Sequence, residues 1–201
     1  MPLRRSILQF LSFIALVVLT LAGFDSAALA HVGNHSGGLA GGLAHPFSGL
    51  DHVLAMVAVG LWASQLGRPA YWLLPVTFPA AMAAGALLGV SGLELPWVEA
   101  GIAASVLVLG AMIAFALRPT IAVSVAVIGL FALVHGYSHG AELPAQGSAW
   151  AYGAGFILAT LGLHMMGLAI GAMSDRAPVR FVARAAGATI AAVGVFLLIA
   201  I

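Results

Sequence analysis

The 201-residue sequence contains no cysteine and few charged side chains. The absence of cysteine excludes disulfide frameworks, thiolate metal sites and cysteine nucleophiles. Charged residues make up only 6% of the chain, whereas soluble domains contain about 25%, so a soluble globular protein is excluded. A disordered chain is excluded too, because disordered segments are rich in charge and poor in apolar residues. The formal net charge of +1 and the lack of a basic patch exclude a nucleic-acid-binding protein.

What the sequence has in abundance is apolar residues. Hydrophobic residues make up 63% of the chain, and the mean hydropathy is +1.14. These values indicate a membrane protein surrounded by lipid. Seven histidines outnumber the six carboxylates, and imidazole is the commonest metal ligand in proteins. Metal chemistry is therefore a candidate function.

The N-terminal segment has the form of a secretory signal peptide. Arg4 and Arg5 precede an apolar run over residues 7–23, and the small-residue sequence Ala28-Leu29-Ala30 follows. We therefore predict that residues 1–30 are removed, while an uncleaved first membrane helix remains the alternative. Residues 31–45 form a Gly-rich polar strip, which we predict to be a periplasmic loop.

The remainder, residues 46–201, predicts an all-α polytopic membrane domain with six transmembrane helices. Each apolar stretch has about the 20 residues that a span needs, and a single segment in lipid satisfies its backbone amides only as a helix. Gly85, Gly89, Gly155 and Gly162 suit close helix packing. The predicted helices are Pro46–Leu66, Ala70–Val90, Trp97–Leu117, Thr120–Tyr137, Ala149–Met173 and Phe181–Ile201.

Arginine placement predicts the orientation of these helices. With an exported N-terminus, the loops after the first, third and fifth helices face the cytoplasm. All arginines of the processed chain fall there, as the positive-inside rule requires, and the opposite loops carry glutamates instead. This sorting predicts an N-out, C-out protein of the bacterial inner membrane. The arginines are Arg68, Arg118, Arg176, Arg180 and Arg184, and the glutamates are Glu94, Glu99 and Glu142.

The first candidate site opens the first predicted helix. His45, Asp51 and His52 lie within eight residues, and the seven-residue spacing of the two histidines puts them on one helix face. Ionisable groups inside a span cost about 2.5–3.5 kcal/mol on insertion scales, and they indicate function by default. The competing interpretation is that Asp51 and His52 only satisfy each other at a helix start.

The second candidate site closes the fourth predicted helix. Spacings of four and three put His135, His139 and Glu142 on one face if the helix continues that far. Two imidazoles and a carboxylate suit a divalent ion of borderline N/O preference. Because the first helix enters from the exported side and the fourth returns to it, both sites are expected at the same end of the protein.

Other residues are weaker candidates. Glu99 lies just inside the third helix at the same end, whereas Glu94 is expected to be a solvated loop charge. His31 and His35 on the N-terminal strip are either a metal-collecting arm or a mobile polar tail. His164 is either a hydrogen-bonding membrane histidine or, with the thioethers beside it, a deeper metal station. The tryptophans are expected to anchor helix ends at the interface: Trp62, Trp72, Trp97 and Trp150.

The sequence resembles the HupE/UreJ family of bacterial nickel or cobalt permeases, which are associated with hydrogenase and urease. The resemblance covers essentially the whole chain, and it rests on three stretches: His45 to Met56, His135 to Glu142, and Gly155 to Thr160 leading to His164. It implies a permease whose functional residues include the first of these motifs, Glu99 and Glu142, with Phe78 contributing. Nickel and cobalt members are similar, so the ion stays open.

The expected function is therefore a secondary or passive permease that imports Ni²⁺ or Co²⁺ through a site at the periplasmic mouth. No nucleotide-binding motif is present, so transport would follow a gradient. The chain is not expected to be an enzyme or to hold a resident cofactor. Its predicted partners are the divalent metal ion and membrane lipid, and assembly into a homo-oligomer is left open. The alternatives are a membrane-embedded metalloenzyme and a metal-delivery accessory protein for hydrogenase or urease.

Overall fold

The computed structural model describes residues 37–143, 147–173 and 177–201, and within these ranges every element is a helix. The predicted all-α class is confirmed there. The predicted signal peptide over residues 1–30, His31 and His35 lie outside the described residues. The elements are α2 (Leu39–Ala44), η2 (His45–Phe47), α3 (Leu50–Leu66), α4 (Ala70–Val90), α5 (Val98–Ala114), α6 (Ile121–Ala141), α7 (Ala149–Ala172) and α8 (Ala177–Ala200).

Helix ends follow local signals in the sequence. The side chain of Thr120 accepts a hydrogen bond from the amide of Val123 at the start of α6, and Ser148 accepts one from Ala151 at the start of α7. Such caps satisfy amides that have no partner within the helix. At the end of α3, Gly67 adopts a φ of 79°, which glycine tolerates without steric cost.

The first predicted helix is broken, which corrects two expectations. The predicted helix Pro46–Leu66 consists of η2 and α3, because Gly49 between them is extended (φ −117°, ψ 126°). The segment Leu39–Phe47 meets Leu50–Leu66 at an angle of 85°. Part of the strip predicted as a loop is therefore helical, because α2 packs against α7 and gains contacts there that its own sequence does not encode.

The fourth predicted helix is longer than expected. Its predicted end was Tyr137, whereas α6 continues to Ala141. Its last turn packs against α4, where a Cβ on Gly140 would collide with the carbonyl of Ala86. This tertiary contact keeps glycine-containing residues helical, and it holds His139 on the helix. The third predicted helix is shorter, because α5 runs from Val98 to Ala114.

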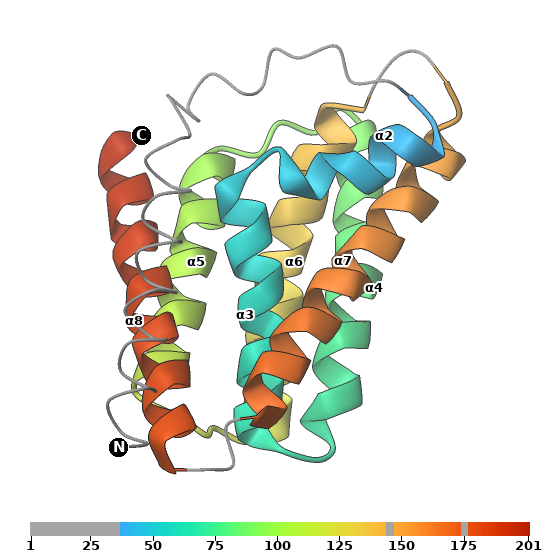
Figure 1. The fold of residues 1–201 in the computed structure, drawn as a ribbon. Coiled ribbons are helices and arrows are strands. Elements are labelled where there is room, and N and C mark those ends of the chain that lie inside the picture. Colours follow the sequence, from blue (N-terminus) through green and yellow to red (C-terminus); the bar gives the residue numbers. More distant parts are fainter. Residues whose placement is uncertain (1–36, 144–146, 174–176) are drawn as a thin grey trace.

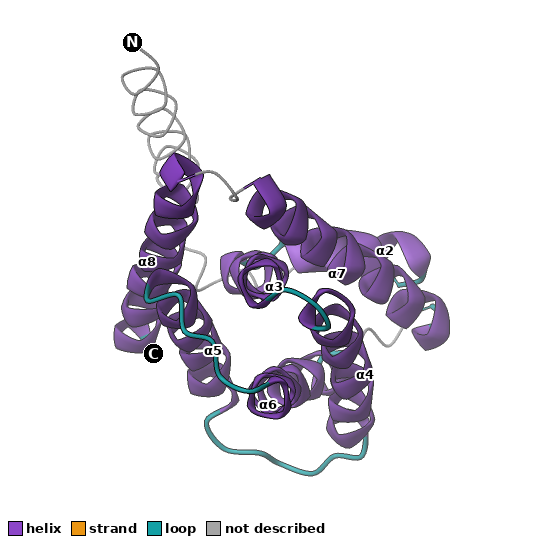
Figure 2. Cartoon of the chain, turned by 90° about the horizontal axis from the view of Figure 1, so that it is seen from below, coloured by secondary structure: helices purple, strands orange, loops and turns teal. Residues whose placement is uncertain are grey.

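The helices form one bundle around α3. Figure 2 shows α3 enclosed by α4, α5, α6 and α7, with α8 outside α5, and the principal pairs are α4 with α6, α5 with α8, and α3 with α7. Successive helices alternate in direction, while α2 lies across one end of the bundle (Figure 1). The face of α3 that contains Ala55, Met56, Val59 and Trp62 is fully buried.

Glycines allow the closest helix contacts. A Cβ on Gly85 would collide with the carbonyl of Leu133, and one on Gly89 would collide with that of Tyr137. Gly155 approaches α2 in the same way. These three glycines behave as predicted, since small residues let helix backbones approach. The prediction for Gly162 is wrong, because nothing lies within 4 Å of a Cβ built there.

Helix length and composition agree with a multi-pass membrane protein. Four helices are long and apolar enough to cross a membrane: α4, α6, α7 and α8. If the bent pair formed by Leu39–Phe47 and Leu50–Leu66 counts as one span, the total rises to five. Helix α5 is a shorter apolar helix. Large apolar side chains such as Val76, Leu130 and Phe196 are more than 60% exposed, which suits contact with lipid.

One of the predicted interfacial tryptophans is buried instead. Trp62 is 0% exposed, and its indole N–H donates a hydrogen bond of 3.1 Å to the carbonyl of Leu117. This hydrogen bond joins α3 to the loop between α5 and α6. Trp72, Trp97 and Trp150 are exposed, as an interfacial position requires.

Candidate metal centre

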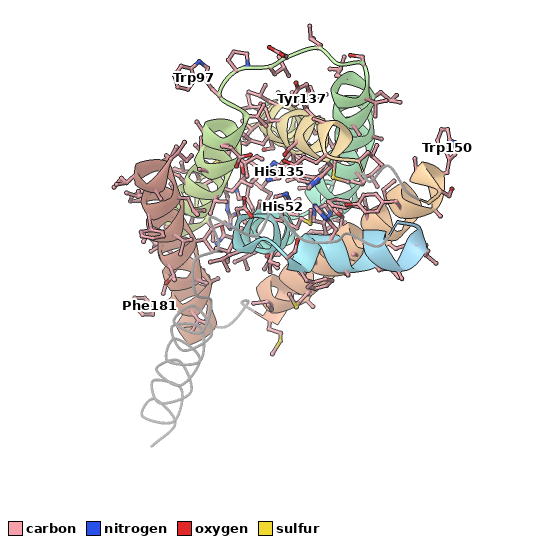
Figure 3. All side chains as sticks on the ribbon, turned by 90° about the horizontal axis from the view of Figure 1, so that it is seen from above. His52, Trp97, His135, Tyr137, Trp150 and Phe181 are labelled. Atoms are coloured by element: carbon pink, nitrogen blue, oxygen red, sulfur yellow. The ribbon has the colours of Figure 1, made fainter. Side chains whose placement is uncertain are left out.

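Four imidazoles gather at the end of the bundle that α2 covers. We call His45, His52, His135 and His139 the outer histidine cluster. The ring centroids lie 4.8 Å apart for His45 and His139, 4.6 Å for His52 and His139, and 5.4 Å for His52 and His135. Figure 3 shows the His52 and His135 side chains between α3 and α6. The two motifs, more than 80 residues apart in the sequence, therefore share one site.

Helix geometry and the break at Gly49 position these rings together. His135 and His139 are four residues apart on α6, so they lie on one face. His52 is in the first turn of α3, and His45 reaches the same place from η2 on the other side of the bend. Three of the four side chains are no more than 7% exposed: His52, His135 and His139.

Asp51 orients the ring of His52. Its Oδ1 accepts a 2.8 Å hydrogen bond from the backbone amide of His52 and lies 2.7 Å from the ring Nδ1 of the same residue. A carboxylate only accepts, so Nδ1 carries the proton and Nε2 keeps its lone pair in the neutral ring. The alternative interpretation of a satisfied polar pair accounts for Nδ1 only, because Nε2 is buried and bonds to no described residue.

His135 is arranged in the same way by its own helix. Its Nδ1 lies 2.9 Å from the backbone carbonyl of Phe131, one turn earlier on α6. Since that carbonyl can only accept, Nδ1 is the donor and Nε2 keeps the lone pair. This Nε2 is also buried, with no hydrogen-bond partner among the described residues.

Two oriented imidazole lone pairs in a buried place are chemically suited to a transition-metal ion. A metal-bound histidine commonly donates its other ring N–H to a carboxylate or backbone carbonyl, which fixes the tautomer and raises basicity. Within the ranges that the structure describes, no three His, Asp or Glu side chains converge as a closed metal centre requires. The geometry therefore provides oriented donors without a complete coordination shell.

The remaining carboxylates of the described residues are exposed at helix ends or in a loop. Glu99 is exposed in the first turn of α5, and Glu142 is exposed at the C-cap of α6. Glu142 interacts electrostatically with Tyr152, whose ring centroid is 5.8 Å from that of His45. Glu94 is exposed in the loop between α4 and α5, as expected. The roles of Glu99 and Glu142 as ligands stay predictions.

Aromatic residues of α7 enclose the cluster, and the sequence reasoning missed them. The ring of Phe156 lies 4.3 Å from that of His139 and 5.7 Å from that of His45. Tyr152 precedes Phe156 by one turn and is also buried. They precede His164 by eight and twelve residues, which points them toward one broad side of α7. Spacing alone does not say whether that side faces lipid or the interior.

Phe78 and His164 lie deeper in the same interior. The Phe78 ring is 5.7 Å from that of His135 and 5.2 Å from that of His164, and both Phe78 and His164 are 0% exposed. Met165 and Met166, which follow His164 in the sequence, are nearly half exposed, whereas His164 is fully buried, so the deeper metal station with thioether donors stays a prediction. Phe78 thus separates the outer histidine cluster from a single inner histidine.

Comparisons with known proteins agree with this architecture. The family model for the HupE / UreJ protein matches residues 19–197. The chain is 46% identical over 185 residues to Protein HupE of Rhizobium leguminosarum bv. viciae, and the alignment covers 91% of this chain and 97% of that protein. No solved structure is significantly similar to the chain. The chain belongs to the HupE/UreJ family of membrane proteins.

Proposed function

We propose that this protein is an inner-membrane permease that imports Ni²⁺ or Co²⁺ and first binds the ion at the outer histidine cluster. The observation that carries the proposal is the pair formed by His52 and His135. Both rings use Nδ1 for a fixed acceptor, and both keep a buried Nε2 with no partner among the described residues. Family membership supports a transported metal ion, which is also what the resemblance in the sequence implies.

The donor chemistry selects a class of ion. Imidazoles favour nickel, cobalt, copper and zinc over magnesium and calcium. Copper binds such donors more tightly than nickel, so selection between these ions depends on geometry and availability. Ionised Asp51 beside His52 also lowers the electrostatic cost of bringing a dication toward lipid.

The incomplete coordination shell suits transport better than permanent binding. Conduction requires a site that attracts the ion yet releases it to the next position. If only His52 and His135 present fixed lone pairs, the ion would keep part of its water shell and exchange its other ligands readily. A structural or hydrolytic zinc site instead has three or four protein ligands, which favours the permease over the metalloenzyme.

The bundle dimensions support six crossings. Helix α5 has 17 residues, which gives a length of about 26 Å at 1.5 Å per residue. That length is close to the hydrocarbon thickness of about 30 Å. Helix α3 also has 17 residues, so it would cross by itself while α2 lies across the end of the bundle.

The charge distribution supports the proposed direction of import. The loops that contain Arg68 and Arg118 lie at one end, while the glutamates Glu94, Glu99 and Glu142 lie at the end with the outer histidine cluster. With arginines in the cytoplasm, the glutamates and histidines face the periplasm. Acidic groups at that mouth would raise the local concentration of cations.

Uptake of radiolabelled nickel by a nickel-transport-deficient bacterium tests the proposal. Cells that express the chain should accumulate nickel, and His52→Ala should abolish the gain, because it removes a lone-pair donor. Unlabelled cobalt as competitor ranks the two ions. Correctly inserted protein without uptake would contradict the proposal and favour the accessory-protein alternative. Uptake by the purified chain in liposomes separates transport from delivery to an enzyme.

Cysteine labelling tests the orientation. The chain has no cysteine of its own, so a single introduced thiol reports its side without background. Ser91→Cys in the exposed end of α4 should react with a membrane-impermeant maleimide added to spheroplasts. Leu117→Cys at the other end should react only after lysis. The opposite pattern would overturn the proposed direction.

A further inference from the structure

Below the outer histidine cluster, α7 presents two buried polar side chains whose polar atoms have no well-formed hydrogen bond within the described chain. They are Thr160 and His164, both 0% exposed. The hydroxyl of Thr160 and both ring nitrogens of His164 lack such a bond. A spacing of four residues on a helix puts the two side chains on one face, about 5–6 Å apart at Cβ. A buried polar group without a partner costs roughly 1–3 kcal/mol, so two together require an explanation.

A third polar group lies at the same place. The backbone carbonyl of Pro75 lies near the His164 ring, although no regular hydrogen bond joins them. In a regular helix this carbonyl would accept a hydrogen bond from residue 79, but residue 79 is also a proline and has no N–H. The second proline of α4 thus leaves an oxygen acceptor for a group in the interior.

These groups lie deeper than the outer histidine cluster. The backbone carbonyl of His164 packs against Gly60 of α3, which is eight residues after His52. At 1.5 Å per residue, the two levels differ by about 12 Å. The ring of Phe78 lies between them, in contact with His135 above and His164 below.

We propose that His164, Thr160 and the Pro75 carbonyl form an inner binding station for a late first-row divalent cation, which reaches it past the ring of Phe78. This inference rests on the proposed transport function and adds a second binding position to it. One imidazole nitrogen and two neutral oxygens suit ions such as nickel and cobalt, with water completing the shell.

The charge distribution assigns this station a role in release. All four carboxylates of the described residues lie at the other end of the bundle. They are at the start of α3, in the loop before α5, in the first turn of α5 and at the end of α6. The inner donors are therefore neutral, and a dication is bound more weakly there than beside Asp51. A weaker second position lets the ion leave toward the side with the arginines.

Matched variants of Thr160 test the proposal with little change in volume. Thr160→Val removes the hydroxyl and keeps the shape, while Thr160→Ser keeps the hydroxyl. The control is Thr189→Val, because the Thr189 hydroxyl donates to the Ala185 carbonyl of its own helix. His164→Gln provides a second, independent variant. Each is purified in nanodiscs for equilibrium binding of radiolabelled nickel and in liposomes for initial rates.

We expect the wild-type protein to bind nickel in a tighter and a weaker class. Thr160→Val and His164→Gln should lose the weaker class, and each should lower the maximal rate about fivefold or more, as the loss of about 1 kcal/mol of binding implies. The KM for external nickel should change little. Thr160→Ser keeps the hydroxyl and should retain the weaker class better than Thr160→Val does. Thr189→Val should behave as the wild type does.

Two results would overturn the inner station, and a third would overturn the proposed function. If Thr160→Val and His164→Gln bind and transport nickel as the wild type does, the inner station is overturned. If both variants only lower the thermal stability, the polar pair holds a structural water and the proposal is again overturned. If the wild-type protein neither binds nor transports nickel, the proposed function itself fails, and the wild-type measurement distinguishes this case from the first two.

Discussion

Replacing Gly49 by alanine should damage the outer histidine cluster while leaving the fold intact. Gly49 has φ −117° and ψ 126°, which alanine adopts without strain. An alanine Cβ at this position would lie 2.5 Å from Oδ1 of Asp51 and 2.8 Å from Nδ1 of His52. The first distance is about 0.9 Å shorter than the 3.4 Å at which ordinary contact begins.

The added methyl group can be accommodated only if the Asp51 carboxylate and the His52 ring move apart or turn away. Losing such an orienting partner typically lowers metal affinity 10–100-fold, which corresponds to about 1.4–2.7 kcal/mol. The free energy of unfolding should change by less than about 1 kcal/mol, because a glycine-to-alanine change at an allowed backbone position also restricts the unfolded chain.

Concentration-dependent nickel uptake and thermal unfolding of the purified protein measure the two effects separately. Gly162→Ala is the matched control, since a Cβ there meets nothing within 4 Å. In an Asp51→Ala background, Gly49→Ala should add little, because the pair it disturbs is already broken. A Gly49→Ala protein with wild-type affinity for nickel would refute the role assigned to the Asp51–His52 pair.

Three further predictions concern the bundle itself. Gly136→Ala should lower the free energy of unfolding by on the order of 1–3 kcal/mol, because a Cβ there collides with the backbone of α4. The control is Gly129→Ala on the same helix, which should be neutral because its Cβ meets one methyl group at 3.8 Å. Equal thermal unfolding of the two variants in detergent would contradict this packing. Tyr137→Phe should lower the free energy of unfolding by about 1–3 kcal/mol and speed proteolysis of the loop between α4 and α5. The Tyr137 hydroxyl holds this loop, because it accepts a hydrogen bond from the amide of Leu95 and donates one to the carbonyl of Leu93. An unchanged cleavage rate would count against this anchor. Trp62→Phe should destabilise the protein by about 1–3 kcal/mol through its lost hydrogen bond and volume, whereas Trp72→Phe at the surface should not, and similar melting curves would disprove the difference.

Much of the fold was predictable because lipid imposes a simple rule on the chain. Apolar segments of about 20 residues must satisfy their backbone groups internally, so their helical state follows from composition. The predicted helix Ala70–Val90 has the bounds observed for α4, and the predicted Ala149–Met173 differs from α7 by one residue. The break at Gly49 was not predictable, because a glycine before a helix fits a simple helix start as well as a bend.

The candidate site was predictable in part. Alternating helix direction brings the starts of odd helices and the ends of even helices to one end, which places the His45–His52 and His135–His139 motifs together. The aromatic residues Phe156 and Tyr152 were missed, because an aromatic residue on a membrane helix gives no sign of whether it faces lipid or the interior. The burial of Trp62 was missed for the same reason.

The sequence by itself determined the all-α class, the helical state of the long apolar segments and the histidines that gather at one end, since each of these depends on composition, segment length and the parity of helix direction. Only the tertiary structure decided which atoms of those residues are available. Asp51 is held by His52, the His135 ring is held by its own helix, and Thr160 faces the interior where Met165 does not. These differences arise from packing between helices far apart in the chain, which no local spacing encodes.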